Sequence, residues 1–257
     1  MENEIGKLQK IIDESNNIVF FGGAGVSTES GIPDFRSQDG LYNQKYDYPP
    51  ETILSHTFFM RRPEEFFKFY RDKMLCDTAK PNAAHLKLAE MEQAGKLKAV
   101  ITQNIDNLHQ MAGSKRVYEL HGSVLRNYCE ACGKFYDAEY MLRSDGVPRC
   151  SCGGRIKPDV VLYEEGLDMT VMARAIQAIQ DADMLILDEA VGACSLGFIK
   201  EERLLELIGC KPEKLEVILT GRNPSETLLA AADYVTEMVM RAHPYTRGIP
   251  ARKGIEY

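Results

Sequence analysis

Short apolar runs recur along the chain, and segments of helical or mixed polarity separate them. Runs of this kind, bounded by polar residues or glycine, predict buried strands. Strands are expected at Ile18–Phe21, Lys98–Thr102, Val117–Leu120, Met184–Leu187, Leu215–Thr220 and Tyr234–Glu237. Helices are expected at Ile5–Asn16, Glu64–Leu75, Asn82–Ala94, Lys200–Ile208 and Ser225–Ala232. This alternation predicts an α/β fold with a Rossmann-like, doubly wound parallel sheet.

The region between the first two strands is longer than a simple connection. Residues Ser37–Pro50 are rich in Gly, Tyr, Asp and Pro without a clear period, which predicts a lid-like loop. The helix expected at Glu64–Leu75 belongs to a segment rich in aromatic residues, and core packing explains these better than a ligand site. They are Phe58, Phe59, Phe66, Phe67, Phe69 and Tyr70. We therefore expect a helical and lid insertion beside the sheet.

A glycine-rich turn follows the first predicted strand, in the stretch IVFFGGAGVSTESGIPDFR at residues 18–36. Glycines let backbone N–H groups approach a phosphate, and the start of a helix favours an anion. Many such turns are only tight connections. Here the continuation Asp34-Phe35-Arg36 places an acid, an aromatic and a base just beyond the turn, which favours a nucleotide site.

Polar residues also follow two later strands. Gln103, Asn104 and Asp106 come directly after the run ending at Thr102, and His121 follows Val117–Leu120. Open α/β sheets bind ligands at the carboxyl ends of their strands. Helix capping could explain Asn104 or Asp106 singly, but not the cluster, and a histidine here is suited to act as a base near neutral pH.

Composition narrows the class of protein. The chain has 257 residues, of which 44% are hydrophobic, and a net charge of −7. No apolar run approaches the ~20 residues of a membrane span, and the polar N-terminus is unlike a signal peptide. We expect a cytoplasmic protein. The negative charge argues against a general nucleic-acid binder.

Four of the seven cysteines form two close pairs, Cys129 with Cys132 and Cys150 with Cys152. Two such pairs suit a tetrahedral structural zinc site, whereas disulfides are rare in the cytoplasm. A module of about residues 123–158 is too small for a core of its own, so the metal should stabilise it. The remaining cysteines, Cys76, Cys194 and Cys210, are expected to be ordinary buried thiols.

The motifs GAGVSTESGIPDFR, TQNIDNLH and ELHG, in this order, resemble the sirtuin family of NAD-dependent protein deacylases over about residues 1–186. The resemblance implies that His121 is the general base, with Asn104 and Asp106 also catalytic. It implies that the NAD-binding residues are Gly23, Ala24, Gly25, Thr28, Asp34, Phe35, Arg36, Gln103, Asn104, Ile105, Asp106, His121 and Asn223.

The same resemblance implies the reaction. The amide oxygen of an acyl-lysine would attack the ribose carbon that bears nicotinamide, and the base would activate a ribose hydroxyl. The extended segment Ile156–Glu165, with Val160, Val161 and Tyr163, would bind the acyl-lysine peptide by strand addition, although it could also be a plain buried strand. Acetyl is the expected acyl group, because the Tyr-x-x-Arg pair of sirtuins that prefer acidic acyl groups is absent: Tyr70 is followed at that spacing by Lys73.

Beyond Met184–Leu187 the pattern changes. A sirtuin would continue with a glycine-threonine-serine turn, but this chain has Asp188-Glu189. Residues 184–257, including TGRN at 220–223 and the closing ARKGIEY, resemble the C-terminal part of the ATP:corrinoid adenosyltransferases. The chain therefore looks chimeric. The phosphate loop G-x-x-x-x-G-K-[ST] that such a transferase requires does not occur in the sequence.

These observations predict a nucleotide-binding domain formed by residues 1–122 and 159–257, with an inserted zinc module at 123–158. The favoured function is NAD-dependent protein-lysine deacylation, with acyl-lysine proteins as partners. The alternatives are an impaired sirtuin-like protein that binds NAD or acyl-lysine, and, less favoured, a corrinoid adenosyltransferase. The target proteins and the oligomeric state do not follow from the sequence.

Overall fold

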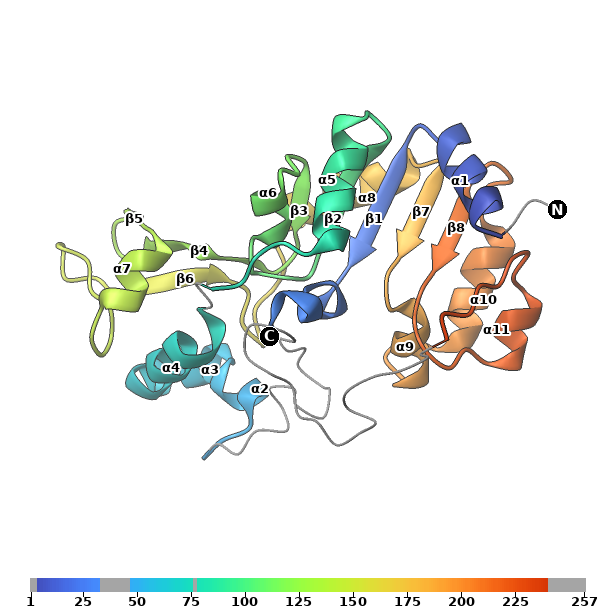
Figure 1. Cartoon of the computed structure of the whole chain (residues 1–257). Helices are drawn as coiled ribbons and strands as arrows, with labels where there is room; N and C mark the ends of the chain where they lie inside the picture. The colour runs from blue at the N-terminus through green and yellow to red at the C-terminus, as the bar shows by residue number, and fades with distance from the viewer. Residues whose placement is uncertain (1–3, 33–46, 76–77, 240–257) are drawn as a thin grey trace.

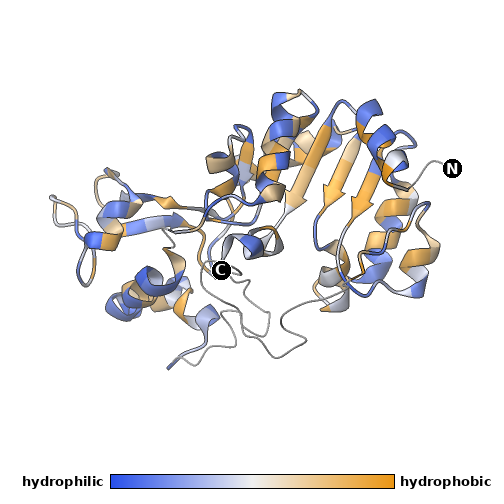
Figure 2. Ribbon diagram, in the orientation of Figure 1, coloured by the Kyte–Doolittle hydropathy of each residue, from blue (hydrophilic) through white to orange (hydrophobic). Residues whose placement is uncertain are grey.

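A computed structural model describes residues 4–32, 47–75 and 78–239. Its centre is a five-stranded sheet in the order β3-β2-β1-β7-β8, and every neighbouring pair is parallel (Figure 1). The strands are β1 (Ile18–Gly22), β2 (Leu97–Thr102), β3 (Val117–Glu119), β7 (Met184–Leu187) and β8 (Glu216–Leu219). The predicted α/β class and parallel sheet are confirmed. In Figure 2 the central strands are strongly hydrophobic, as a sheet covered on both faces requires.

Successive side chains of each strand point to opposite faces of the sheet, and a separate core lies on each face. Phe20 and Met184 contact the cluster that includes Leu88 of α5 (Ala83–Gln93), with Ile11 of α1 (Glu4–Glu14) packed against it. On the other face, Leu185 joins Ala175 of α8 (Met169–Gln180). The helices therefore cover the sheet from both sides.

The insertion expected after β1 is helical where the structure describes it. It contains α2 (Pro50–Ile53), α3 (His56–Arg61), α4 (Pro63–Phe69) and a π-helical turn, η3 (Tyr70–Met74). The helix predicted at Glu64–Leu75 is thus an α-helix that continues into a π-turn. All six aromatics predicted as core are buried. Residues 37–46 of the expected lid lie outside the described residues.

The cysteine-bearing module joins this helical insertion. Its three-stranded sheet has the order β5-β4-β6, with β4 (Gly122–Cys129), β5 (Phe135–Tyr136) and β6 (Ile156–Val160). The helix α7 (Ala138–Arg143) connects β5 to the second pair of cysteines. One hydrophobic cluster contains Phe66 and Tyr70 of the insertion together with Val124 and Ile156 of the module. The two insertions therefore share a core on one side of the main sheet (Figure 1).

The C-terminal part continues from β7 with α9 (Ala190–Ser195), α10 (Glu201–Cys210), β8 and α11 (Glu226–Ala230). Its own core contains three buried residues, Val191, Leu204 and Leu228. The strand predicted at Tyr234–Glu237 is wrong: these residues form no strand, and Tyr234 and Val235 are exposed. The five-stranded sheet ends at β8, so among the described residues this segment has no strand to pair with.

Two further expectations concern the remaining cysteines and the membrane. Cys194 is only partly buried and Cys210 is exposed, so the prediction of buried thiols is wrong for both, and Cys76 lies outside the described residues. Both lie in the thinly packed C-terminal part, which offers few places for complete burial. Within the described ranges, no helix has the length and apolar character needed to cross a membrane.

Candidate active site

The glycine turn begins where β1 ends at Gly22 and leads into a short 3-10 helix, η1 (Ala24–Ser30). A Cβ atom on Gly22 would lie 2.6 Å from the Phe20 ring, so the chain needs glycine there. Among the described residues, a Cβ on Gly23 would meet nothing closer than the Gln103 side chain at 4.0 Å. The backbone at Gly23 is therefore open to a ligand. Thr28 closes the turn, since its Oγ1 donates to the Gly25 carbonyl at 2.9 Å.

A hydrogen-bonded network of polar side chains lies beside this turn. The Ser27 hydroxyl donates to Asp106 Oδ2 at 2.7 Å, and Asn104 Nδ2 donates to Ser27 Oγ at 2.9 Å. The backbone N–H of Leu108 donates to Asp106 Oδ1 at 2.9 Å and starts α6 (Leu108–Ala112). The structure thus brings Asn104 and Asp106 together, as predicted.

Ser27 joins these two side chains and was missed by the sequence reasoning. It is only 1% exposed, which is unusual for a serine in a loop after a glycine turn. The available signal was its place in the Val-Ser-Thr segment directly after the glycines. A buried hydroxyl needs a partner, and the polar cluster after β2 was the nearest candidate.

His121 lies next to the end of β3, at the same sheet edge. Its Nδ1 is 3.0 Å from the carbonyl oxygen of Gln103, whose own N–H donates to the Gly22 carbonyl at 3.1 Å. A carbonyl oxygen can only accept, so Nδ1 carries the hydrogen in the neutral ring. The lone pair is therefore on Nε2, which is available to take a proton.

The backbone around His121 is held from two sides. Leu120 N donates to Thr102 O at 2.9 Å, and Val161 N donates to His121 O at 3.0 Å. The next residue, Gly122, has φ +77, and a Cβ there would lie 1.9 Å from the Asp159 carbonyl. Only glycine fits this position, so the orientation of His121 depends on it.

Two buried histidines lie close enough to Asp106 of this network to interact with it electrostatically. The rings of His85 and His109 are 4.7 Å apart, and both side chains are at most 1% exposed. Burial and, to a smaller extent, the neighbouring His85 lower the pKa of His109 to about 4, although Asp106 acts in the opposite direction. Burial also lowers the pKa of His85. Both rings are therefore neutral at physiological pH.

The residues predicted to bind a peptide form the segment that leaves β6. Val160 is paired with Gly122 and is buried, and Val161 N donates to His121 O as described. Tyr163 N donates to Leu54 O at 3.0 Å, and the Tyr163 side chain is 47% exposed. This segment therefore runs between His121 and the helical insertion.

The C-terminal part of the chain also contacts the glycine turn. A Cβ atom on Gly25 would lie 3.0 Å from Cγ of Glu189 and 3.7 Å from its Oε1. Asp188 is directed elsewhere, because its Oδ1 accepts from Thr220 Oγ1 at 2.8 Å. Asn223 lies in the exposed turn after β8, with φ +54.

The remaining predicted residues are placed as follows. Ile105 is partly buried against the core shared by the two insertions, and its carbonyl accepts from Val124 N at 3.1 Å. Ala24 begins η1. Asp34, Phe35 and Arg36 lie outside the described residues.

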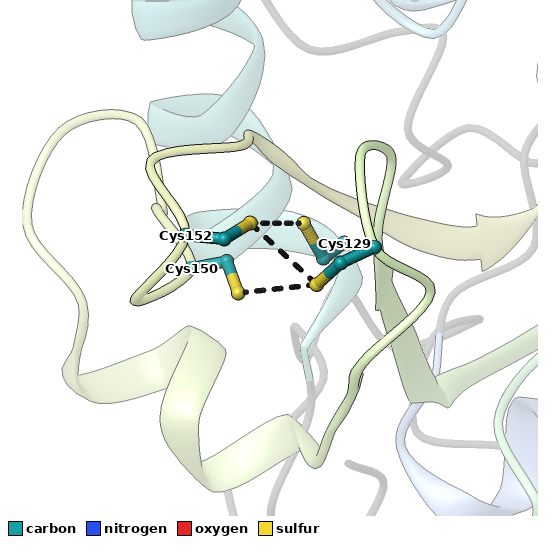
Figure 3. A group of neighbouring side chains, drawn as sticks. Cys129, Cys150 and Cys152 are labelled. Atoms are coloured by element: carbon teal, nitrogen blue, oxygen red, sulfur yellow. Dashed lines mark hydrogen bonds between the residues drawn. The ribbon is translucent and has the colours of Figure 1, made fainter.

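The four predicted metal ligands converge between the two loops of the module, as Figure 3 shows for the three labelled cysteines. The Sγ atoms of Cys129 and Cys152 are 3.5 Å apart, and those of Cys132 and Cys150 are 3.6 Å apart. Sulfurs bound to one tetrahedral zinc at 2.3 Å are about 3.8 Å apart, so the donor set fits zinc. Hydrogen bonds, chiefly from the backbone N–H of Cys152, lower the pKa of Cys150 to about 5, and hydrogen bonds with the neighbouring thiols raise the pKa of Cys152.

The close packing of the sulfurs requires a residue without a side chain at Gly154. A Cβ atom on Gly154 would lie 2.7 Å from the Cys129 Sγ atom and 3.4 Å from that of Cys152. The Cys150 N–H donates to the Gly154 carbonyl at 2.8 Å and folds the loop back on itself. All four donors come from the protein, so a zinc ion here would be structural.

Comparison with known proteins gives two family matches. The Sir2 family matches residues 23–194, and the ATP:corrinoid adenosyltransferase family BtuR/CobO/CobP matches residues 161–257. The matches overlap over 161–194, which contains β7.

Curated relatives and solved structures agree with the first match. An NAD-dependent protein deacetylase of Clostridium perfringens is 63% identical over 190 residues, which are 73% of this chain and 78% of the relative. One of Clostridium acetobutylicum is 60% identical over 76% of this chain and 79% of the relative. A structure described under the mechanism and regulation of Sir2 enzymes has a TM-score of 0.70 at 38% identity, covering 91% of each chain. A structure of Sir2 bound to acetylated peptide has a TM-score of 0.66 at 33% identity, covering 87% of this chain and 89% of the other.

Proposed function

Because this chain belongs to the Sir2 family, we propose that it is an NAD-dependent protein-lysine deacetylase in which His121 is the general base. The acyl group is transferred to ADP-ribose, and nicotinamide is released. The observation that carries the proposal is the contact of His121 Nδ1 with the Gln103 carbonyl, which leaves the lone pair of the neutral ring on Nε2.

The residues on the β1 and β2 side of the site suit NAD. Gly23 offers open backbone to a diphosphate, and Asn104 and Asp106 offer an amide and a carboxylate to hydroxyl groups. NAD supplies a ribose carbon whose bond to nicotinamide can be exchanged for a bond to the acyl oxygen. Ser27 holds Asn104 and Asp106 in one arrangement, so it is a positioning residue.

His121 takes a proton from a ribose hydroxyl through Nε2. The fixed Nδ1–H at Gln103 keeps this tautomer, and the Gly122 backbone keeps the ring at the edge of the sheet. General-base catalysis of this kind contributes about 10²- to 10⁴-fold to the rate. The acyl-lysine peptide lies against the segment of Val160, Val161 and Tyr163, whose own backbone is held by the bonds from Val161 N to His121 O and from Tyr163 N to Leu54 O.

We also propose that residues 123–158 are a zinc-stabilised module inserted between the two parts of the nucleotide-binding domain, residues 1–122 and 159–257. Cys129, Cys132, Cys150 and Cys152 hold the metal, which supplies folding free energy to the module and takes no part in the reaction. Strands β4 and β6 connect the cysteine site to the His121 region, because β4 begins at Gly122 and ends at Cys129.

The test is the reaction of the purified, zinc-loaded protein with acetyl-lysine peptide and NAD. Release of nicotinamide and formation of O-acetyl-ADP-ribose are expected. His121→Ala should lower turnover by at least about 10²-fold while NAD binding, measured by calorimetry, is retained. Unchanged turnover in His121→Ala would refute the role of His121.

A second function, an NAD- or acyl-lysine-binding protein with little turnover, is favoured by the Glu189 side chain beside Gly25. NAD binding without nicotinamide release would support it. ATP with reduced cobalamin serves as a parallel assay for adenosyl transfer, which should be absent because the chain has no phosphate loop.

A further inference from the structure

The Glu189 side chain lies between two glycines that belong to opposite sides of the site. A Cβ atom on Gly25 would lie 3.0 Å from Cγ of Glu189, and one on Gly192 would lie 3.1 Å from its Oε2. Neither position could carry a side chain unless Glu189 moved. The carboxylate therefore lies over the glycine turn, on the β7 side.

The backbone of Glu189 is fixed by the end of β8. Its N–H donates to Thr220 Oγ1 at 2.9 Å, and the Val191 N–H donates to the Thr220 carbonyl at 3.1 Å. Gly221 permits this approach, because a Cβ there would lie 2.7 Å from the Val191 side chain. Glu189 has φ +57, a conformation that non-glycine residues adopt at a cost. Because the backbone is held in this way, only rotation about the side-chain bonds of Glu189 can move the carboxylate.

We propose that the Glu189 carboxylate competes with the diphosphate of NAD for the space over Gly25 and thereby sets the affinity for the dinucleotide. This inference rests on the proposed function. A diphosphate bound at the glycine turn would lie next to a carboxylate of the same charge sign. Asp188 contributes less, because Thr220 holds its carboxylate towards β8.

Electrostatics gives the direction and the order of magnitude of the effect. Two like charges about 4 Å apart repel by about 1 kcal/mol in bulk water, which corresponds to about fivefold in affinity. Salt screens this repulsion, because the Debye length falls from about 8 Å at 0.15 M to about 3 Å at 1 M. NAD binding to the native protein should therefore weaken less with added salt than binding to a variant without the carboxylate.

The experiment measures the Kd values of NAD and ADP-ribose by calorimetry for the full zinc-loaded chain and its variants. Glu189→Gln removes the charge and keeps the shape, and we expect both Kd values to fall by about fivefold or more. Glu189→Gly also removes the backbone cost of the positive φ and should bind at least as tightly. In steady-state assays, KM for NAD should fall while kcat stays nearly constant.

The matched control is Glu213→Gln, which makes the same charge change in the C-terminal part. Glu213 is exposed and precedes β8, so it lies at the opposite edge of the sheet from the glycine turn. Its Kd for NAD should equal that of the native protein.

Each other outcome is decisive. Equal NAD affinity in native protein and Glu189→Gln, with nicotinamide still released, would overturn this inference and leave the proposed function intact. Weaker binding in Glu189→Gln would show that the carboxylate is a ligand, which also overturns it. If neither the native protein nor any variant bound NAD or released nicotinamide, the proposed function would fail as well.

Discussion

Strands β2 and β3 on one side of β1 and strands β7 and β8 on the other continue the same parallel ladder, but their surroundings differ. Five of the six residues of β2 are buried, whereas no residue of β8 is fully buried. The polar side chains that converge at the glycine turn come from the β2 and β3 side, and Glu189 comes from the β7 side. A sheet can therefore be completed by its backbone alone, but an active site requires particular side chains.

The two sides also differ in packing. Fifteen buried residues form the core shared by the helical insertion and the cysteine module, whereas the core beside α9–α11 contains three. Large apolar side chains near this small core remain exposed, including Leu196 at 64% and Phe198 at 54%. The following predictions test this contrast between the densely packed part and the C-terminal part.

Removal of zinc should have the largest effect, and it should be confined to the first of these parts. Chelation should unfold the module at 123–158, because structural zinc sites contribute about 10 kcal/mol or more. Deacetylation should fall to background, and limited proteolysis should cut the module before the main sheet. Cys132→Ser should behave like the metal-free protein, and Cys210→Ser, at an exposed position in α10, should not. Full activity in metal-free protein would contradict the structural role.

Truncation in the core of the main sheet and in the small C-terminal core should separate global from local stability. Ile101→Ala, at a site only 1% exposed in β2, should lower the free energy of unfolding by about 2–5 kcal/mol. Leu228→Ala in the small core should chiefly accelerate amide exchange in α9–α11. Urea denaturation and hydrogen exchange measure the two effects. Equal loss of global stability in both variants would show that the two parts unfold as one unit.

Acid should destabilise the protein through His109, which lies in α6 between β2 and β3. The unfolded chain takes up the histidine proton near pH 6.5, whereas the folded protein does so only near pH 4. Stability from this group is therefore complete above pH 6.5 and is lost as the pH falls towards 4, by up to about 3 kcal/mol. His109→Gln should show a shallower decline in urea denaturation between pH 7 and pH 4.5. A decline equal to that of the native protein would assign it to other groups.

The smallest predicted effect compares two helix caps. Ser225 Oγ accepts from Leu228 N at 3.0 Å, and Ser225→Ala should cost about 1 kcal/mol, felt locally in α11. Asn82 caps α5 and also donates to the Val26 carbonyl at 2.7 Å, so Asn82→Ala should cost more and disturb the helix after the glycine turn. Thermal unfolding of both variants, with NAD affinity measured alongside, tests this order. A larger loss of NAD affinity in Ser225→Ala would reverse it.

The sequence predicted the strands of the main sheet closely, because buried parallel strands are continuous apolar runs. Met184–Leu187 coincides with β7, and Leu215–Thr220 contains β8. The helices α8 and α9 were not predicted, and the expected strand at Tyr234–Glu237 does not form. Periodicity is a local signal, whereas pairing of a strand depends on a neighbour that the local sequence does not specify.

The site was less predictable than the fold. The cysteine spacing indicated the metal ligands, since the donor types themselves carry the chemistry. Ser27 was missed because its partners, Asn104 and Asp106, lie far from it along the chain. The sequence places Asp188 and Glu189 side by side after β7, and the structure distinguishes them: Thr220 donates to Asp188, whereas the Glu189 side chain lies beside Gly25.

The position of β7 has a consequence for how such proteins can be assembled. β7 pairs through its peptide groups with β1 on one side and β8 on the other, in unbroken register over its whole length. Peptide hydrogen bonds do not depend on the identity of the side chains, so a recombination point inside this strand would leave its pairing with β1 and β8 intact. Shuffling libraries of α/β enzymes should accordingly cross over within a central strand, and then screen the two residues that follow it, where the incompatibility between parents becomes apparent.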